Sequence, residues 1–274
     1  MSAVRMIGPM PQIGFGTWNR NGEEAYSSVT SALDAGYRHI DTAEGYRNEE
    51  FVGKAIAESG VPRADIFVTT KIAPESYAPG QIMGHVKTSL DKLRTDKVDL
   101  LLLHWPSIKD KYDIKDYMAQ FAAVYDAGLT RHIGVSNFTK HYLDSAISLL
   151  GGRPLTTNQC EIHVLMQNRI IVDHCATKGI PMTAYSPLAR GAVSQSEPLR
   201  AIGNHYGASA EQVALAFLMA EGYVVIPSSA KPERIRSNFA AKDVALSAED
   251  VAAIRKLDQG RRLVNGDWCP KWDA

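Results

Sequence analysis

Val98-Asp99-Leu100-Leu101-Leu102-Leu103 is the stretch that decides the fold class. All of its residues except Asp99 are aliphatic, and polar and apolar positions do not alternate. A strand that packs against apolar groups on both faces has this pattern, which is typical of parallel sheets covered by helices. The segment therefore predicts a buried strand of an α/β protein.

Short apolar runs of the same kind recur along the chain. They predict strands at 37–41, 66–71, 98–104, 133–136, 157–162, 181–185 and 223–226. The segments between them have helical periodicity and predict helices at 23–35, 48–59, 79–93, 114–127, 141–150, 167–178 and 208–221. A weaker eighth strand is expected at 240–244, before a last helix at 248–257 with Ser247 as its N-cap.

The polar residues at the ends of these strands distinguish a closed barrel from an open sheet. Nearly every predicted strand ends in side chains suited to chemistry: Asp41, Lys71, His104, Ser136, Asn137, Gln159, Glu161, Tyr185, Ser186, Ser228 and Ser229. A barrel gathers all of its strand ends around one mouth, whereas an open sheet has its site at one crevice. No linker interrupts the alternation, so the sequence predicts a single (β/α)₈ TIM barrel domain over residues 1–274.

Composition argues against several classes of function. The 274 residues include 30 basic and 30 acidic side chains, so no broad charge would attract nucleic acid or an anionic membrane. No apolar stretch is long enough for a signal peptide or a membrane span. The three cysteines are widely spaced and odd in number, which fits a reducing compartment. We expect a cytoplasmic protein without nucleic-acid or membrane partners.

Several catalytic motifs are absent. The glycines of Gly14-Phe15-Gly16 lack the third glycine and the helix start of a Rossmann dinucleotide fingerprint. The chain contains no H-E-x-x-H, no paired C-x-x-C and no G-x-S-x-G. Cys160 and His163, or His174 and Cys175, are weak candidates for zinc ligands. We therefore expect no metal site.

Four segments carry a resemblance to a known family. They are Gly36-Tyr37-Arg38-His39-Ile40-Asp41-Thr42-Ala43-Glu44-Gly45-Tyr46-Arg47-Asn48-Glu49, then Val68-Thr69-Thr70-Lys71, then Val98-Asp99-Leu100-Leu101-Leu102-Leu103-His104-Trp105-Pro106, then Ile133-Gly134-Val135-Ser136-Asn137-Phe138. In this order they resemble the signatures of the aldo-keto reductases. Segments 58–63, 92–99 and 225–229 look most like bacterial 2,5-diketo-D-gluconate reductases of the B type, which also act on methylglyoxal-like dicarbonyls.

The resemblance implies NADPH-dependent reduction of a carbonyl group, which needs a hydride for the carbon and a proton for the oxygen. Tyr46 would supply the proton, and the Lys71 ammonium would lower the pKa of the phenol. Asp41 would pair with Lys71, and His104 would donate a hydrogen bond to the substrate oxygen. The four residues are predicted to form one catalytic group.

The same resemblance implies a cofactor site along the later strands. Its expected members are Ser136, Asn137 and Gln159 at the nicotinamide carboxamide, Tyr185 on the ring, Ser186, Leu188 and Gly191 over the pyrophosphate, and Ser228, Ser229, Lys231, Arg234 and Asn238 at the adenosine end. Arg234 would meet the phosphate and the adenine, and Asn238 the adenine. Ser228 stands where the family often has a lysine for the 2′-phosphate. We expect NADPH, with NADH competing better than in relatives that carry the lysine.

The resemblance also places aromatic residues at the substrate opening, here Trp18, Trp105 and Trp268. The short C-terminal stretch favours small substrates: dicarbonyls such as methylglyoxal, keto-sugars such as 2,5-diketo-D-gluconate, and aldehydes. A monomer is expected, as is usual for the family. Two alternatives stay open: a barrel that binds the cofactor for regulation or redox sensing with negligible turnover, and a metal-dependent barrel hydrolase.

Overall fold

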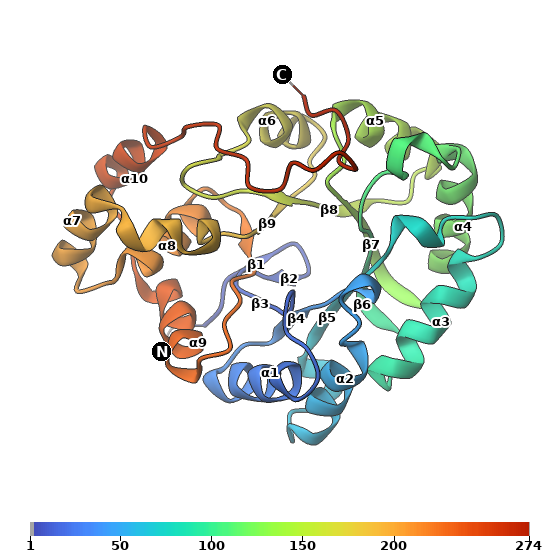
Figure 1. Ribbon diagram of the computed structural model, residues 1–274, viewed down its shortest axis with the longest axis horizontal. Coiled ribbons are helices and arrows are strands. Elements are labelled where there is room, and N and C mark those ends of the chain that lie inside the picture. The colour runs from blue at the N-terminus through green and yellow to red at the C-terminus, as the bar shows by residue number, and fades with distance from the viewer. Residues whose placement is uncertain (1–2, 274) are drawn as a thin grey trace.

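Eight parallel strands form a ring at the centre of the structure, a computed structural model that describes residues 3–273 (Figure 1). Each strand pairs with the next one along the chain. The strands are β3 (Phe15–Gly16), β4 (His39–Asp41), β5 (Phe67–Ile72), β6 (Val98–Leu103), β7 (Thr130–Ser136), β8 (Leu155–Glu161), β9 (Met182–Tyr185) and β10 (Val224–Val225).

Hydrogen bonds between the first and last strands close the ring. Ile13 forms a parallel bridge with Val225. The Gly14 N–H donates to the Val225 carbonyl at 2.8 Å, and the Val225 N–H donates to the Gln12 carbonyl at 2.9 Å. The predicted (β/α)₈ barrel is confirmed.

The eighth strand is not where the sequence predicted it, and that prediction was wrong. Residues 240–244 instead form the end of helix α9 (Pro232–Ala240) and a 3₁₀ turn, η6 (Ala241–Asp243). The missing strand is β3, which is only two residues long and therefore gives no apolar run. Gly14, just before β3, and Gly16 within it allow close approach. A Cβ on Gly14 would lie 2.7 Å from His39 Nδ1, and one on Gly16 would lie 2.9 Å from the Ile226 carbonyl oxygen.

Helices surround the ring of strands, as Figure 1 shows. Most agree with the predicted helices to within a few residues: α1 (Glu23–Ala35), α2 (Glu49–Glu58), α3 (Ile82–Leu93), α4 (Ile114–Asp126), α5 (Lys140–Leu149), α6 (Arg169–Thr177), α8 (Ala210–Ala220) and α10 (Ala248–Arg255). The Ser247 side chain accepts a hydrogen bond from the Asp250 N–H at 3.1 Å, so the predicted N-cap of α10 is confirmed. Helix α7 (Glu197–Tyr206) was not predicted. No helix within residues 3–273 is long and apolar enough to span a membrane.

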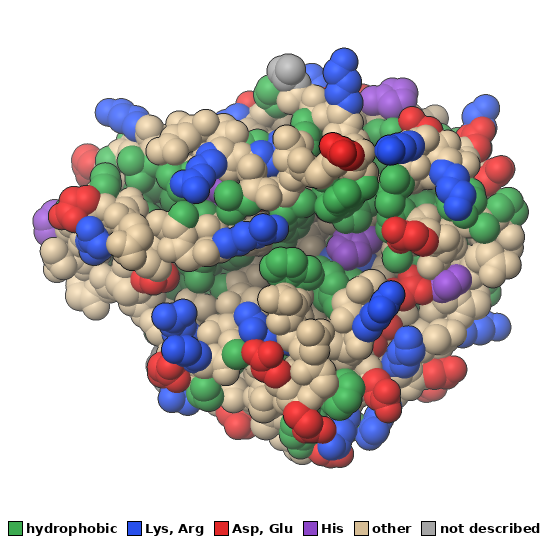
Figure 2. Space-filling model, viewed as in Figure 1, with side chains coloured by type: hydrophobic (Ala, Val, Ile, Leu, Met, Phe, Trp, Pro, Cys, Tyr) green, Lys and Arg blue, Asp and Glu red, His purple; other side chains and the backbone are tan. Residues whose placement is uncertain are grey.

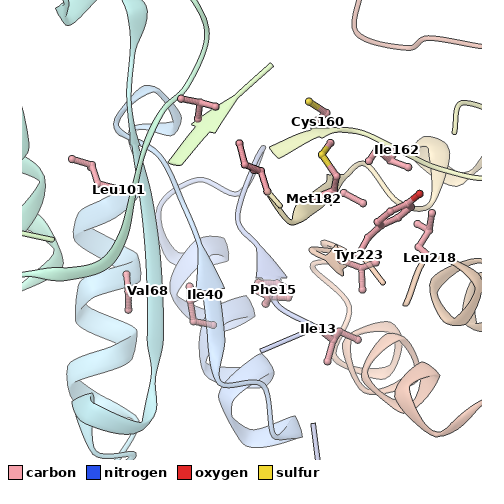
Figure 3. Close-up of a cluster of buried hydrophobic side chains, with 14 of the residues drawn as sticks. Ile13, Phe15, Ile40, Val68, Leu101, Cys160, Ile162, Met182, Leu218 and Tyr223 are labelled. Atoms are coloured by element: carbon pink, nitrogen blue, oxygen red, sulfur yellow. The ribbon is translucent and has the colours of Figure 1, made fainter. Parts of the chain in front are cut away.

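The barrel has two distinct hydrophobic regions. One lies between the strands and the helices, and Figure 3 shows part of it, with Ile40, Val68 and Leu101 among its members. The other is a small cluster of Met10, Leu100, Leu102 and Val224. Met10 belongs to a hairpin of β1 (Met6–Ile7) and β2 (Met10–Pro11), which precedes β3 and therefore lies at the end where the strands begin. That end of the barrel is filled, and the opposite end is left for a site.

Candidate active site

Lys71 is the centre of a cluster at the ends of the strands. Its side chain is fully buried, and its Nζ donates to Asp41 Oδ1 at 2.5 Å and to the Thr42 carbonyl at 2.8 Å. The Tyr46 hydroxyl lies 3.4 Å from the same nitrogen. Three of the four residues predicted to be catalytic are thus joined through one ammonium group.

Asn48 holds the turn that carries Tyr46. Tyr46 ends a 3₁₀ turn, η1 (Glu44–Tyr46), which follows β4. The buried Asn48 amide accepts from the Thr42 hydroxyl at 2.8 Å and donates to the carbonyl groups of Thr17 at 2.9 Å and Arg20 at 2.8 Å. These bonds tie the turn to the loop after β3 and so fix the phenol beside Lys71. Sequence reasoning missed Asn48.

His104 completes the predicted group. It follows β6, and its N–H donates to the Ile72 carbonyl at 3.0 Å, which continues the pairing with β5. Its imidazole meets the Tyr46 ring edge to face, with ring centroids 5.5 Å apart. The structure therefore brings all four residues together, although their catalytic roles stay predictions.

Burial and the Lys71 charge set the protonation states of this cluster. Burial raises the pKa of Tyr46 more than Lys71 lowers it, so the pKa lies above its ordinary value of 10.0. Lys71 acts in the expected direction, because its charge and its hydrogen bond lower the pKa, but burial outweighs both. Burial would lower the pKa of Lys71, but the interactions with Asp41 and Tyr46 together outweigh burial, and the pKa is raised. Burial, aided by Lys71, holds the pKa of His104 well below 6.5. At neutral pH the site presents a phenol, an ammonium ion and a neutral imidazole.

The residues predicted for the nicotinamide form a hydrogen-bonded chain next to this cluster. The Tyr185 hydroxyl donates to Asn137 Oδ1 at 2.9 Å, and Asn137 Nδ2 donates to Ser136 Oγ at 3.0 Å. Ser136 Oγ donates to the Gln159 carbonyl, and Gln159 Nε2 donates to Asp41 Oδ2 at 2.8 Å. The bond from Gln159 to Asp41, which the sequence did not predict, joins the two sets of residues.

The loop after β9 has an unusual backbone. Ser186 and Arg190, in a loop that includes the 3₁₀ segment η5 (Ala189–Gln195), have positive φ angles of 49° and 51°. Non-glycine residues in this region are strained, and such strain is concentrated at ligand sites. The Arg190 guanidinium lies 5.4 Å from the Trp18 ring centroid, so this loop meets the loop after β3. Leu188 packs on the hydrophobic core, and a Cβ on Gly191 would meet no atom within 4 Å.

Cationic side chains gather where α9 begins. Lys231 and Arg234 are exposed, and neither forms a salt bridge within the described part of the chain. Ser229 Oγ accepts from the Lys231 N–H at 3.1 Å. Arg20, which sequence reasoning missed, donates from Nε to Ser228 Oγ at 3.3 Å. Arg20 also pairs with Glu24. Lys231 and Arg234, which lack a salt bridge in the described chain, lie beside a helix N-terminus and so fit a phosphate group. The buried Asn238 lies further along the same helix.

Two of the three predicted tryptophans lie together. Trp105 and Trp268 meet edge to face with centroids 4.5 Å apart, and Trp105 is 6.5 Å from His104. Trp18 instead lies under Arg190. Figure 2 shows a hollow near the centre of this face, with hydrophobic side chains, a histidine and a basic side chain at its edge. The site therefore has an aromatic side next to the proposed proton donor.

The weak zinc candidates have other partners. Glu161 and His163 are both fully buried and hydrogen-bonded to each other at 3.0 Å. Cys160 and Cys175 are buried free thiols, and burial raises the pKa of both. Among residues 3–273, no cluster of three or more histidine, cysteine or acidic side chains could hold a metal ion.

Comparisons with known proteins agree with this geometry. The profile of the aldo/keto reductase family matches residues 12–259. The chain is 44% identical over 265 residues to methylglyoxal reductase DkgB of Escherichia coli O157:H7, which covers 96% of this chain and 99% of that protein. It is 39% identical over 254 residues to an aldo-keto reductase of Mycolicibacterium smegmatis (93% and 92% covered). A solved structure with the provisional name 2,5-diketo-D-gluconic acid reductase B superposes with a TM-score of 0.92 at 39% identity, covering 97% of this chain and 94% of that one.

Proposed function

The chain belongs to the aldo/keto reductase family, and from this premise we propose that it uses NADPH to reduce the carbonyl group of small aldehydes and dicarbonyls. The observation that carries the proposal is the bonded group of Asp41, Lys71 and Tyr46 beside His104 at the open end of the barrel. A family match without this group would support only the fold.

The proposed chemistry places two donors at the carbonyl oxygen. The Tyr46 hydroxyl and the neutral His104 imidazole would both donate to it, which holds the oxygen and polarises the carbonyl. A bound reduced nicotinamide would supply the hydride for the carbonyl carbon. As negative charge develops on the oxygen, Tyr46 releases its proton to it, and the Lys71 ammonium stabilises the phenolate that remains. The raised pKa of Tyr46 keeps that proton in place until the charge appears.

The cofactor preference is proposed from the charges near α9. A 2′-phosphate distinguishes NADPH from NADH, and Lys231 and Arg234 are cations without a salt-bridge partner in the described chain. Arg20 adds a guanidinium group beside Ser228, the position where the family's lysine is missing. These residues favour NADPH, with NADH as the weaker ligand.

The substrate class is proposed from the relatives and from the aromatic side of the site. Methylglyoxal reductase DkgB is the name of a protein 44% identical to this chain. Trp105 and Trp268 make an apolar wall beside His104. Methylglyoxal and 2,5-diketo-D-gluconate are the first substrates to test, followed by simple aldehydes.

Substitution of Tyr46 by phenylalanine tests the proton donor. The ring and its contact with His104 remain, whereas the proton is lost. We expect kcat for methylglyoxal to fall by about 10²- to 10⁴-fold, followed through the loss of NADPH absorbance. The Kd of NADPH, measured by quenching of tryptophan fluorescence, should stay within about twofold. A variant with near wild-type turnover would refute the assignment, and a wild-type protein that binds NADPH but turns over no carbonyl would point to a regulatory barrel.

Titration with both nucleotides tests the cofactor preference. Arg234→Ala should weaken NADPH binding by about tenfold, because one charge-assisted phosphate contact is lost, and should leave NADH binding nearly unchanged. Equal weakening of both nucleotides would contradict a role at the 2′-phosphate.

A further inference from the structure

The C-terminal segment, residues 261–273, runs along the β8 side of the barrel toward α5 (Figure 1). It is attached at both ends. Near its start, the N–H groups of Leu263 and Val264 donate to the Glu161 side chain. Near its end, Asp273 Oδ2 accepts from the Lys140 N–H at 2.9 Å, at the start of α5. The residues between these two attachments include Trp268.

Glu161 is the buried member of this attachment. Its side chain is fully buried at the end of β8. Oε1 accepts from the Leu263 N–H at 2.7 Å and from His163 Nε2 at 3.0 Å, and Oε2 accepts from the Val264 N–H at 2.9 Å. Burial would raise the pKa of Glu161, but these hydrogen bonds outweigh it and hold the pKa below its ordinary value of 4.5. A buried carboxylate is stable only while such partners stay in place, so Glu161 and the two N–H groups fix each other.

The middle of the segment forms a tight turn around Trp268. The Cys269 N–H donates to the Gly266 carbonyl at 2.9 Å, which closes a turn. A Cβ on Gly266 would lie 2.3 Å from Trp268 Nε1, so the indole packs directly on the glycine backbone. The position of the indole therefore follows the position of this turn, which Glu161 anchors two residues before it.

Aromatic rings connect this turn to the proposed proton donor. Trp268 contacts Trp105, Trp105 lies beside His104, and His104 contacts Tyr46, with centroid separations of 4.5, 6.5 and 5.5 Å. A carbonyl compound held by Tyr46 and His104 has its far end toward the tryptophans if it is long enough to reach them. A compound of three carbons is too short to span this row of rings.

We propose that Glu161 is a positioning residue that, through Leu263 and Val264, places Trp268 at the opening of the site and so sets the affinity for aldehydes with an aromatic group. The inference rests on the proposed reductase function. Methylglyoxal, which is too small to reach Trp268, depends on Glu161 much less than benzaldehyde does.

Glu161→Gln tests this directly. The amide keeps the size of the side chain, but it turns an N–H donor toward one of the two backbone N–H groups. We expect the KM for benzaldehyde to rise by about three- to tenfold relative to the KM for methylglyoxal, with the ratio of the two kcat values unchanged. Trp268→Ala should give a similar change, and the double variant should be no worse than either single variant, because both changes remove the same contact.

Limited trypsin digestion gives a readout that does not depend on turnover. Arg261, Arg262 and Lys271 are cleavage sites in the segment. Glu161→Gln should be cut there at least about threefold faster than the wild type, because release of two hydrogen bonds makes local opening easier. If the wild type reduces neither carbonyl, the proposed function fails, whereas the digestion still tests the attachment.

Asp99→Asn is the matched control. Asp99 also accepts from a backbone N–H, that of Val68 at 3.0 Å, and from basic side chains, but it lies where β6 begins, away from the site. It should change neither KM nor cleavage of the segment.

If Glu161→Gln does not fold, Glu161→Asp, which keeps the charge, should show a smaller change in the same direction. The proposal would be overturned if Glu161→Gln shifted the KM values for benzaldehyde and methylglyoxal equally, or if trypsin cut the segment no faster than in the wild type. It would also be overturned if the effects of Glu161→Gln and Trp268→Ala on KM multiplied in the double variant.

Discussion

Lys71 illustrates at the scale of one residue how the site depends on paired charges. Its ammonium is fully buried and bonded to Asp41 at 2.5 Å. Asp41→Asn removes the charge partner and leaves a buried cation, which should lower the free energy of unfolding by about 3–5 kcal/mol. Urea denaturation followed by circular dichroism measures this loss.

Asp126→Asn provides the comparison for that experiment. Asp126 pairs with Arg153 at 2.6 Å, but it is half exposed, so water replaces the lost partner and the urea midpoint should hardly move. If both variants lost the same free energy of unfolding, leaving the buried Lys71 unpaired would cost no more than leaving the exposed Arg153 unpaired.

The protonation states also predict the pH dependence of the reaction. The pKa of His104 lies well below 6.5, so the imidazole gains a proton only at more acidic pH. The pKa of Tyr46 lies above 10.0, so the phenol loses its proton only in more alkaline solution. We therefore expect kcat/KM to be flat from about pH 6.5 to about pH 10 in the free enzyme. A titration midpoint between about pH 7 and pH 9 would show that the Lys71 charge outweighs burial at Tyr46.

The sequence could predict the catalytic residues because strand ends meet at one mouth of a barrel. Asp41, Lys71 and His104 lie at or next to the ends of neighbouring strands, and their motifs match a family. The sequence could not show the net pKa shift of Tyr46, which depends on how much water the folded loops exclude. Nor could it show the bond from Arg20 to Ser228, since 208 residues separate them along the chain.

At the scale of the elements, two helices touch through one glycine. A Cβ on Gly53 of α2 would lie 2.4 Å from the Lys92 carbonyl oxygen and 2.6 Å from Leu93 Cα of α3. Backbone atoms cannot move aside as a side chain can, so Gly53→Ala should cost about 3 kcal/mol or more in stability. Gly84→Ala, also in a helix, meets no atom within 4 Å and should stabilise the protein by about 0.5–1 kcal/mol. Thermal unfolding of the two variants compares them, and shifts of the same sign would contradict the argument.

The long strand β6 could be predicted from the sequence, whereas the very short strand β3 could not. Strand β6 has six residues and an apolar run that is visible in the sequence, whereas β3 has two and owes its place to pairing with β4 and with residues 225–227. Such pairing joins residues that are far apart in the sequence, so it leaves little pattern in the local sequence from which a strand could be predicted. A simple alternation of strands and helices has one helix between two strands. Both α7 and α8 lie between β9 and β10, so the sequence pattern predicted α8 but not α7.

At the scale of the whole molecule, the two ends of the barrel should respond differently to substitution. Met10→Ala would leave a cavity among Leu100, Leu102 and Val224, and we expect a loss of about 2–5 kcal/mol in unfolding free energy. The cavity lies where the strands begin, so KM and kcat at 25 °C should change by less than about twofold. Urea denaturation and steady-state kinetics on the same preparation check both expectations. A large loss of activity in a folded variant would mean that the two ends are coupled.

The hairpin that carries Met10 fills one end of the barrel, so reactants can enter only at the other end. If the nucleotide and the carbonyl compound both bind at the strand ends, as proposed, they share this opening. The reactant that lies deeper must then bind first and leave last. Turnover then follows a compulsory sequence, and a dead-end analogue of the later reactant would inhibit uncompetitively against the earlier one.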